Sequence, residues 1–160
     1  MERTAVAGFA LLAALAGGGC PPRPAAPVAA VPVALVAAVK GTIEQWRQAY
    51  EIRSMDALAR LYAHDPGLAI AQDGALQLGW TSIEAALRAR LARATAIHVR
   101  ITDLQISALG PDAAVANATM TRESTDGMTT VTEHGVLTLA LRRDDPGWVI
   151  AGEHYSYKRK

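Results

Sequence analysis

The chain has 160 residues and a formal net charge of +1 at pH 7, from 16 basic and 15 acidic side chains. This near balance provides no strong electrostatic field, so neither nucleic acid nor an acidic substrate is expected as a partner. Because the first forty residues differ from the rest, the length allows one folded domain of ~120 residues. The single cysteine, Cys20, excludes an internal disulfide and a multi-cysteine metal site.

The first twenty residues predict a signal peptide. A polar start with one arginine is followed by the apolar run Ala5–Ala16, which breaks at three glycines directly before Cys20. Such a run would form a helix of ~18 Å, shorter than the roughly 30 Å hydrocarbon core of a bilayer. A permanent membrane span is therefore not expected here.

Cys20 and the small residues before it resemble the lipobox of bacterial lipoproteins, in which the cysteine becomes the lipid-modified first residue. The sequence departs from that pattern at Gly17, where the family usually has leucine, and at Pro21 after the cysteine. The resemblance implies export and a lipid anchor on Cys20, which would hold the protein in the cell envelope, either in the periplasm or at a membrane. Ordinary cleavage of the leader and an uncleaved anchor are the alternatives.

Residues 21–38 contain five of the eight prolines and almost no charge. This composition favours an extended tether over packed structure. The alternative is that residues 33–39 already begin the first helix of the domain, because no proline follows Pro32 in this stretch. The folded domain is predicted to cover residues 39–160.

Hydrophobic periodicity predicts an α+β domain in which three helices cover one face of a curved, mainly antiparallel sheet. A short hairpin with Asp73-Gly74 at its turn separates the second helix from the third. Beyond Ala96 the apolar period changes from helical to alternating, which indicates long strands. The expected helices cover 39–50, 54–62 and 81–91, the hairpin strands 68–71 and 76–78, and the long strands 99–106, 113–123, 129–143 and 148–157.

The order of these elements resembles the SnoaL-like group of the nuclear transport factor 2 superfamily, which includes ketosteroid-isomerase-like proteins. The residues that carry the likeness are Asp73-Gly74, Gly79-Trp80, and the closing segments Gly147–Ile150 and His154–Ser156. The resemblance implies a cystatin-like cone roll in which the bent sheet encloses a pocket. It also implies a homodimer formed through the outer face of the sheet.

A ketosteroid-isomerase mechanism requires a carboxylate base that faces the pocket. The resemblance places that base at about Ile70, which cannot accept a proton, and the nearest acid, Asp73, is interpreted as a turn former. This absence favours a binding function over an enzymatic one. No glycine-rich phosphate loop is present, so no cofactor is expected.

Strict alternation along the last strand predicts that His154 and Ser156 point together, on the face shared by Trp148 and Ile150. The resemblance implies that such a histidine often faces the cavity, and a hydrogen-bonded structural role is the alternative. Four aromatic residues elsewhere in the chain either line the pocket or belong to the core. The complete set of pocket candidates is Trp46, Tyr50, Tyr62, Trp80, His154 and Ser156.

Glu133 is the only acid within the third long strand, and it is a candidate base if it faces inward. The favoured alternative is an exposed charge on the outer face. Histidines 64, 98, 134 and 154 show no metal-ligand spacing, so no metal is expected.

Two functional hypotheses follow, with a structural alternative. The preferred one is an exported, lipid-anchored protein that binds a small apolar molecule in the cone or acts as a dimeric interaction module. The second is an isomerase, dehydratase or cyclase that uses His154 with Glu133 or Tyr50 for proton transfer. The purely structural alternative is a cone filled by its own side chains, with an apolar patch on the outer sheet.

Overall fold

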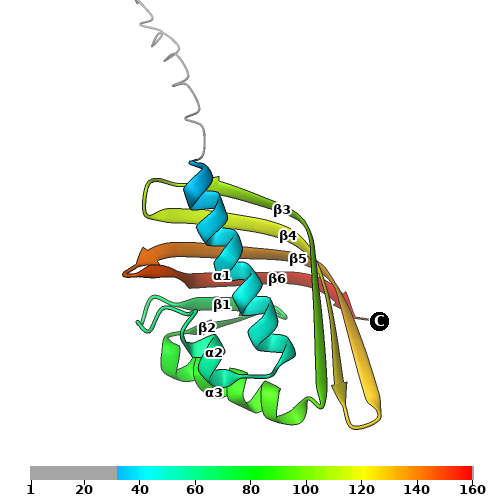
Figure 1. Cartoon of the computed structure of the whole chain (residues 1–160). Helices are drawn as coiled ribbons and strands as arrows, with labels where there is room; N and C mark the ends of the chain where they lie inside the picture. Colours follow the sequence, from blue (N-terminus) through cyan, green and yellow to red (C-terminus); the bar gives the residue numbers. More distant parts are fainter. Residues whose placement is uncertain (1–31, 160) are drawn as a thin grey trace, which may run out of the picture.

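The computed structural model describes residues 32–159, which form one α+β unit (Figure 1). The predicted signal peptide, Cys20 and the first part of the tether lie outside these residues. The elements are α1 (Val33–Glu51), α2 (Met55–Ala59), β1 (Ala69–Gln72), β2 (Ala75–Leu78), α3 (Trp80–Arg93), β3 (Ala96–Ala108), β4 (Ala113–Asp126), β5 (Thr129–Asp144) and β6 (Gly147–Arg159).

Helix α1 begins at Val33, not at Val39, so residues 33–38 belong to the helix instead of the tether. The alternative that the sequence left open is the one observed. Pro32 stands at the N-cap, where the lack of a backbone N–H is harmless, and Leu35 buries its side chain in the core. Among residues 32–159, no helix is long and apolar enough to cross a membrane.

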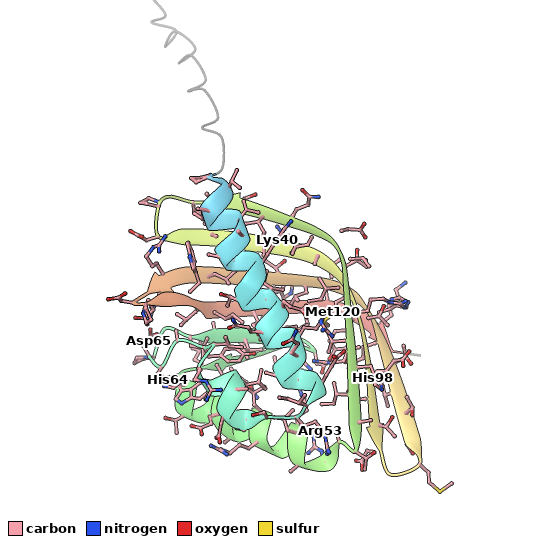
Figure 2. All side chains as sticks on the ribbon, in the orientation of Figure 1. Lys40, Arg53, His64, Asp65, His98 and Met120 are labelled. Carbon is pink, nitrogen blue, oxygen red and sulfur yellow. The ribbon has the colours of Figure 1, made fainter. Side chains whose placement is uncertain are left out.

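The six strands form one sheet in the order β2-β1-β6-β5-β4-β3. All neighbouring pairs are antiparallel except β1 and β6, so the predicted class, helices on a curved and mainly antiparallel sheet, is confirmed. The long strands bend around α1, which lies across the concave face, while α2 and α3 lie near the short hairpin β1–β2 (Figure 1). The concave face and the helices enclose the core, which includes Met120 (Figure 2).

A β-bulge in β6 changes which side chains face the core. Leu141 pairs with Ile150 and Ala140 pairs with Gly152, so Ala151 is an extra residue without its own partner. A bulge of this kind shifts the alternation by one residue. Buried side chains therefore continue from Trp148 and Ile150 to Glu153 and Tyr155, and the prediction of strict alternation is wrong beyond Ala151.

Candidate ligand site inside the cone

A buried carboxyl group, that of Glu153 on β6, is the centre of a polar network inside the cone. Its side chain is 4% exposed. The Trp46 indole N–H and the Tyr62 hydroxyl donate to Oε1 at 2.9 and 2.6 Å, and the Tyr155 hydroxyl donates to Oε2 at 2.9 Å. Trp46 comes from the inner face of α1, and the chain at Tyr62 is held by backbone hydrogen bonds to Ile150.

Burial raises the pKa values of the acidic groups in this network. It raises the pKa of the Glu153 carboxyl, because a charge is poorly solvated in the core, and the hydrogen bonds from Tyr62 and Tyr155 oppose the rise only in part. Burial and the neighbouring Glu153 also raise the pKa of the Tyr62 and Tyr155 hydroxyls well above the ordinary range. Glu153 thus holds a proton to a higher pH than an exposed glutamate does.

A buried ion pair lies next to this network. Arg122 on β4 donates from Nε to Oε2 of Glu133 on β5 at 2.7 Å, and its Nη2 lies 2.5 Å from the same oxygen. The guanidinium also stacks over the rings of Tyr155 and Tyr157, 5.2 and 5.9 Å from their centroids. Glu133 therefore faces the interior, and the favoured interpretation of an exposed outer charge is wrong.

Two polar atoms in this interior are buried without a hydrogen-bond partner among the described residues. They are Nη1 of Arg122 and the hydroxyl of Tyr50. Tyr62 lies close enough to influence the pKa of Tyr50, but the two hydroxyls are not in hydrogen-bonding geometry. Each atom is a donor with no acceptor, and such atoms are rare in native cores.

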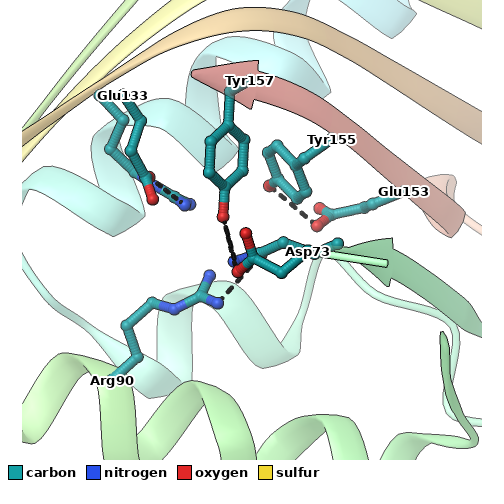
Figure 3. Close-up of polar contacts among 8 residues, drawn as sticks. Asp73, Arg90, Glu133, Glu153, Tyr155 and Tyr157 are labelled. Atoms are coloured by element: carbon teal, nitrogen blue, oxygen red, sulfur yellow. Dashed lines mark hydrogen bonds and ion pairs between the residues drawn. The ribbon is translucent and has the colours of Figure 1, made fainter. Parts of the chain in front are cut away.

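The mouth of the cone is closed by a chain of hydrogen bonds (Figure 3). Arg90 of α3 donates to Gln72 at 3.0 Å, the Gln72 amide donates to the Tyr157 hydroxyl at 2.8 Å, and Tyr157 donates to Asp73 at 2.9 Å. A pocket of about 200 Å³ opens here between the β1–β2 hairpin and α3. Asp73 is in the hairpin turn as predicted, with φ of 54°, and also accepts a hydrogen bond that the sequence did not indicate.

The predicted site residues divide between the two faces of the sheet. Trp46, Tyr50 and Tyr62 lie in the interior, whereas His154 and Ser156 are exposed on the outer face because of the bulge at Ala151. Neither of these last two can line the cone, and this is a correction to the prediction.

Two other predicted positions lie near the edge of the interior. Trp80 is partly buried, and its ring stacks on His64 with centroids 4.2 Å apart. Ile70, the expected position of an isomerase base, is buried and pairs with Glu153 across β1 and β6, so an acid does occupy this part of the core but on the neighbouring strand.

Sequence reasoning missed most of the polar network. Glu153, Arg122, Arg90 and Tyr157 were not among the candidates. The available signal was the alternation of Glu153, Tyr155 and Tyr157, which places an acid and two hydroxyls on one face of a strand. Within the described part of the chain, no three His, Cys, Asp or Glu side chains converge as metal ligands.

The cone-shaped α+β fold with a polar interior defines the class of protein, and the sequence identifies the family. Residues 39–159 match the model of the SnoaL-like domain, so the chain belongs to the SnoaL-like family. No curated protein sequence matches the chain.

Solved structures share this fold at low sequence identity. A proposed aromatic ring hydroxylase from Novosphingobium aromaticivorans is 17% identical, with a TM-score of 0.75 over 82% of this chain and 95% of that one. A proposed dehydratase of the NTF2-like family from Streptomyces avermitilis is 22% identical, with a TM-score of 0.73 over 80% and 99%. A type 2 hexachlorocyclohexane dehydrochlorinase, LinA, is 14% identical, with a TM-score of 0.69 over 79% and 88%. At these identities the likeness shows the fold alone.

Proposed function

We propose that this protein binds a small, largely apolar molecule inside the cone through one carbonyl or carboxyl oxygen. The observation that supports this is the pair of buried donors without acceptors, Arg122 Nη1 and the Tyr50 hydroxyl. Leaving such a group unsatisfied in a core costs roughly 1–3 kcal/mol, which a ligand oxygen would recover on binding.

Burial acts to lower the pKa of Arg122, but the acidic neighbour Glu133 opposes this effect, and the pKa stays above its ordinary value. The guanidinium therefore stays charged, and its Nη1 remains a strong donor. The surrounding aromatic side chains supply the apolar contact that a mostly hydrocarbon ligand requires.

Entry is expected at the mouth, where the pocket of about 200 Å³ lies beside Gln72, Asp73 and Arg90. Strand β2 is exposed along its whole length and pairs only with β1. Displacement of β2 alone would break only its pairing with β1, since β1 itself is held by β6 and by the buried Ile70. The hydrogen-bond chain through Tyr157 acts as the closure that a ligand must open.

The test is ligand binding with Tyr50→Phe. Benzoate and acetophenone, titrated into the protein, should raise the melting temperature saturably, and Tyr50→Phe should weaken their binding about tenfold because one hydrogen bond to the ligand is lost. The control is Ser156→Ala on the outer face, which should bind normally. A Tyr50→Phe variant that binds both probes as tightly as the unmodified protein would contradict the proposal.

A second candidate function is proton transfer on such a ligand by Glu153. The specific observation is a buried carboxyl with a raised pKa that accepts hydrogen bonds from two hydroxyls, a typical environment for an acid or base. The earlier pairing of His154 with Glu133 or Tyr50 is not proposed again, because His154 is on the opposite face of the sheet. Glu153→Gln should abolish turnover of a substrate while leaving its binding within about threefold.

Export and membrane anchoring through Cys20 are also proposed, on the resemblance of the leader to a lipobox. Cys20→Ser should move the protein from the membrane fraction to the soluble fraction of the cell envelope. A protein that stays in the membrane fraction after this change is anchored in another way.

A homodimer through the outer face of the sheet is the proposed oligomeric state. On this face Val136 is 51% exposed, and its cross-strand neighbours Thr119 and Ser156 are small. Val136→Lys should convert a dimer to a monomer in native mass spectrometry, whereas Met128→Lys, at the exposed β4–β5 turn, should not. A dimer that survives Val136→Lys uses another surface.

A further inference from the structure

A second hollow of the molecule is an open groove of about 1010 Å³ between the helices and the β5–β6 hairpin. Its walls come from α1, α2, the segment after α2, and the hairpin residues 143–149. It is separate from the mouth of the cone, which lies between the β1–β2 hairpin and α3. Tyr62 lines this groove and also contacts Glu153, so the groove and the cone interior lie on either side of one side chain.

One residue that lines the groove has a buried donor without an acceptor. Trp148 lines it, is 5% exposed, and its indole N–H has no hydrogen-bond partner among the described residues. The ring is fixed in place, since the Arg143 guanidinium stacks 5.2 Å from its centroid and Arg143 donates to Asp112 at 2.9 Å. A rigid, desolvated N–H favours binding of an acceptor atom.

A free positive charge lies in the same groove. Arg60, at the C-cap of α2, lines it, and its guanidinium has no side-chain hydrogen bond or ion pair within residues 32–159. Apolar surface is available in the same groove from Ile52, which is 69% accessible at the end of α1, whereas Ala49 and Leu61 line the groove with buried side chains. The acidic side chains Asp144 and Asp145 also line the hairpin wall, so a bound anion is favoured at a distance from these two carboxylates, on the side of Arg60.

A glycine inside a helix leaves one part of the groove wall without a side chain. Gly41 lies in α1 and lines the groove, and a Cβ added there would meet nothing within 4 Å. A glycine in a helix interior is destabilising by roughly 0.5–1 kcal/mol relative to alanine, and no close packing requires it here. Its effect on the surface is to leave space that a side chain would occupy.

We propose that this groove is a second binding site, for a small amphipathic carboxylate. Its carboxylate accepts hydrogen bonds from the Trp148 indole N–H and from Arg60, and its hydrocarbon part lies on the exposed Ile52. The site is independent of the one proposed inside the cone, because it uses a different buried donor and a different opening.

The experiment is a titration of the ¹⁵N-labelled full-length chain with hexanoate, followed through the three indole N–H signals, one for each tryptophan. Trp148→Phe assigns the Trp148 signal by its disappearance. Hexanoate should shift this signal downfield saturably, while hexanol, which lacks the charge, should bind at least tenfold more weakly. Arg60→Gln should weaken hexanoate binding about tenfold for the same reason.

Gly41 provides a matched pair of variants that keep the helix intact. Gly41→Leu should abolish the hexanoate shift by filling the groove, whereas Gly41→Ala, which adds only a methyl group, should keep it. The proposal is overturned if hexanoate leaves the Trp148 signal unchanged or if the two variants bind equally. A saturable shift confined to Trp46, which donates to Glu153 inside the cone, would also overturn it and would instead support binding in the cone.

Discussion

Two buried glutamates on neighbouring strands, Glu133 and Glu153, are stabilised in different ways. Glu133 faces the guanidinium of Arg122, with a 2.5 Å contact between charged groups. Glu153 accepts hydrogen bonds from three neutral donors, and burial raises its pKa. An opposite charge maintains a buried carboxylate, while neutral donors leave the carboxyl with a tendency to hold its proton. The first arrangement suits a structural pair, and the second suits a group that exchanges protons.

The largest expected effect comes from breaking the ion pair. Arg122→Met leaves Glu133 buried without its cation, so the free energy of unfolding should fall by about 3–5 kcal/mol. Urea denaturation measures this change. The double variant Arg122→Met/Glu133→Leu is the control and should recover most of the loss, because neither charge is then buried alone. A single variant that loses less than about 1 kcal/mol would show that Glu133 does not depend on Arg122.

The neutral donors around Glu153 can be tested by comparing two tyrosines. Tyr62→Phe removes the donor at 2.6 Å, and the free energy of unfolding should fall by about 1–3 kcal/mol. Tyr50→Phe removes a buried hydroxyl that has no partner, so it should be neutral or stabilising. Equal losses in the two variants would indicate that the hydrogen bond to Glu153 contributes nothing.

The pH dependence of the free energy of unfolding tests the environment of Glu153. Folding raises the pKa of Glu153 above its ordinary value of 4.5, so the folded state holds this proton more tightly than the unfolded chain does. The resulting stabilisation is fully present below about pH 4.5 and is lost as the pH rises through the raised pKa, with a slope of at most about 1.4 kcal/mol per pH unit.

A control variant is needed for this measurement because acids with a lowered pKa make the stability change with pH in the opposite direction. The pKa of Glu44 is lowered to about 2 by Arg47, and Arg142 lowers that of Asp65. The difference in free energy of unfolding between the unmodified protein and Glu153→Gln reports the contribution of Glu153 alone. This difference should become smaller as the pH rises above 4.5. A difference that is independent of pH would show that the pKa of Glu153 is the same in the folded and unfolded states.

An exposed ion pair should have the smallest effect. Arg88 contacts Glu84 at 2.6 Å one turn earlier on α3, but both side chains are accessible to water. Glu84→Gln should lower the free energy of unfolding by only about 0.3–0.5 kcal/mol. A loss comparable with that of Arg122→Met would mean that burial is not what makes the Arg122–Glu133 pair important.

Much of the fold was predictable from local patterns. The helical spacing of apolar residues, the turn at Asp73-Gly74 and the change to alternation beyond Ala96 all depend on neighbours in sequence, and each corresponds to an observed element. The start of α1 was less certain because the alanine and valine content of residues 33–38 suits both a helix and an extended tether. The contact of Leu35 with the core favours the helix.

The sequence by itself determined the class of fold, the family and the aromatic residues of the interior, because periodicity and turn chemistry are local properties. Tertiary structure alone decided which polar side chains meet. The bulge at Ala151 exists only through pairing with β5, and it moves His154 outward and Glu153 inward. Trp46 and Glu153 are 107 residues apart, so their hydrogen bond depends on the packing of α1 across the sheet. The raised pKa of Glu153 follows from that burial, which no local pattern encodes.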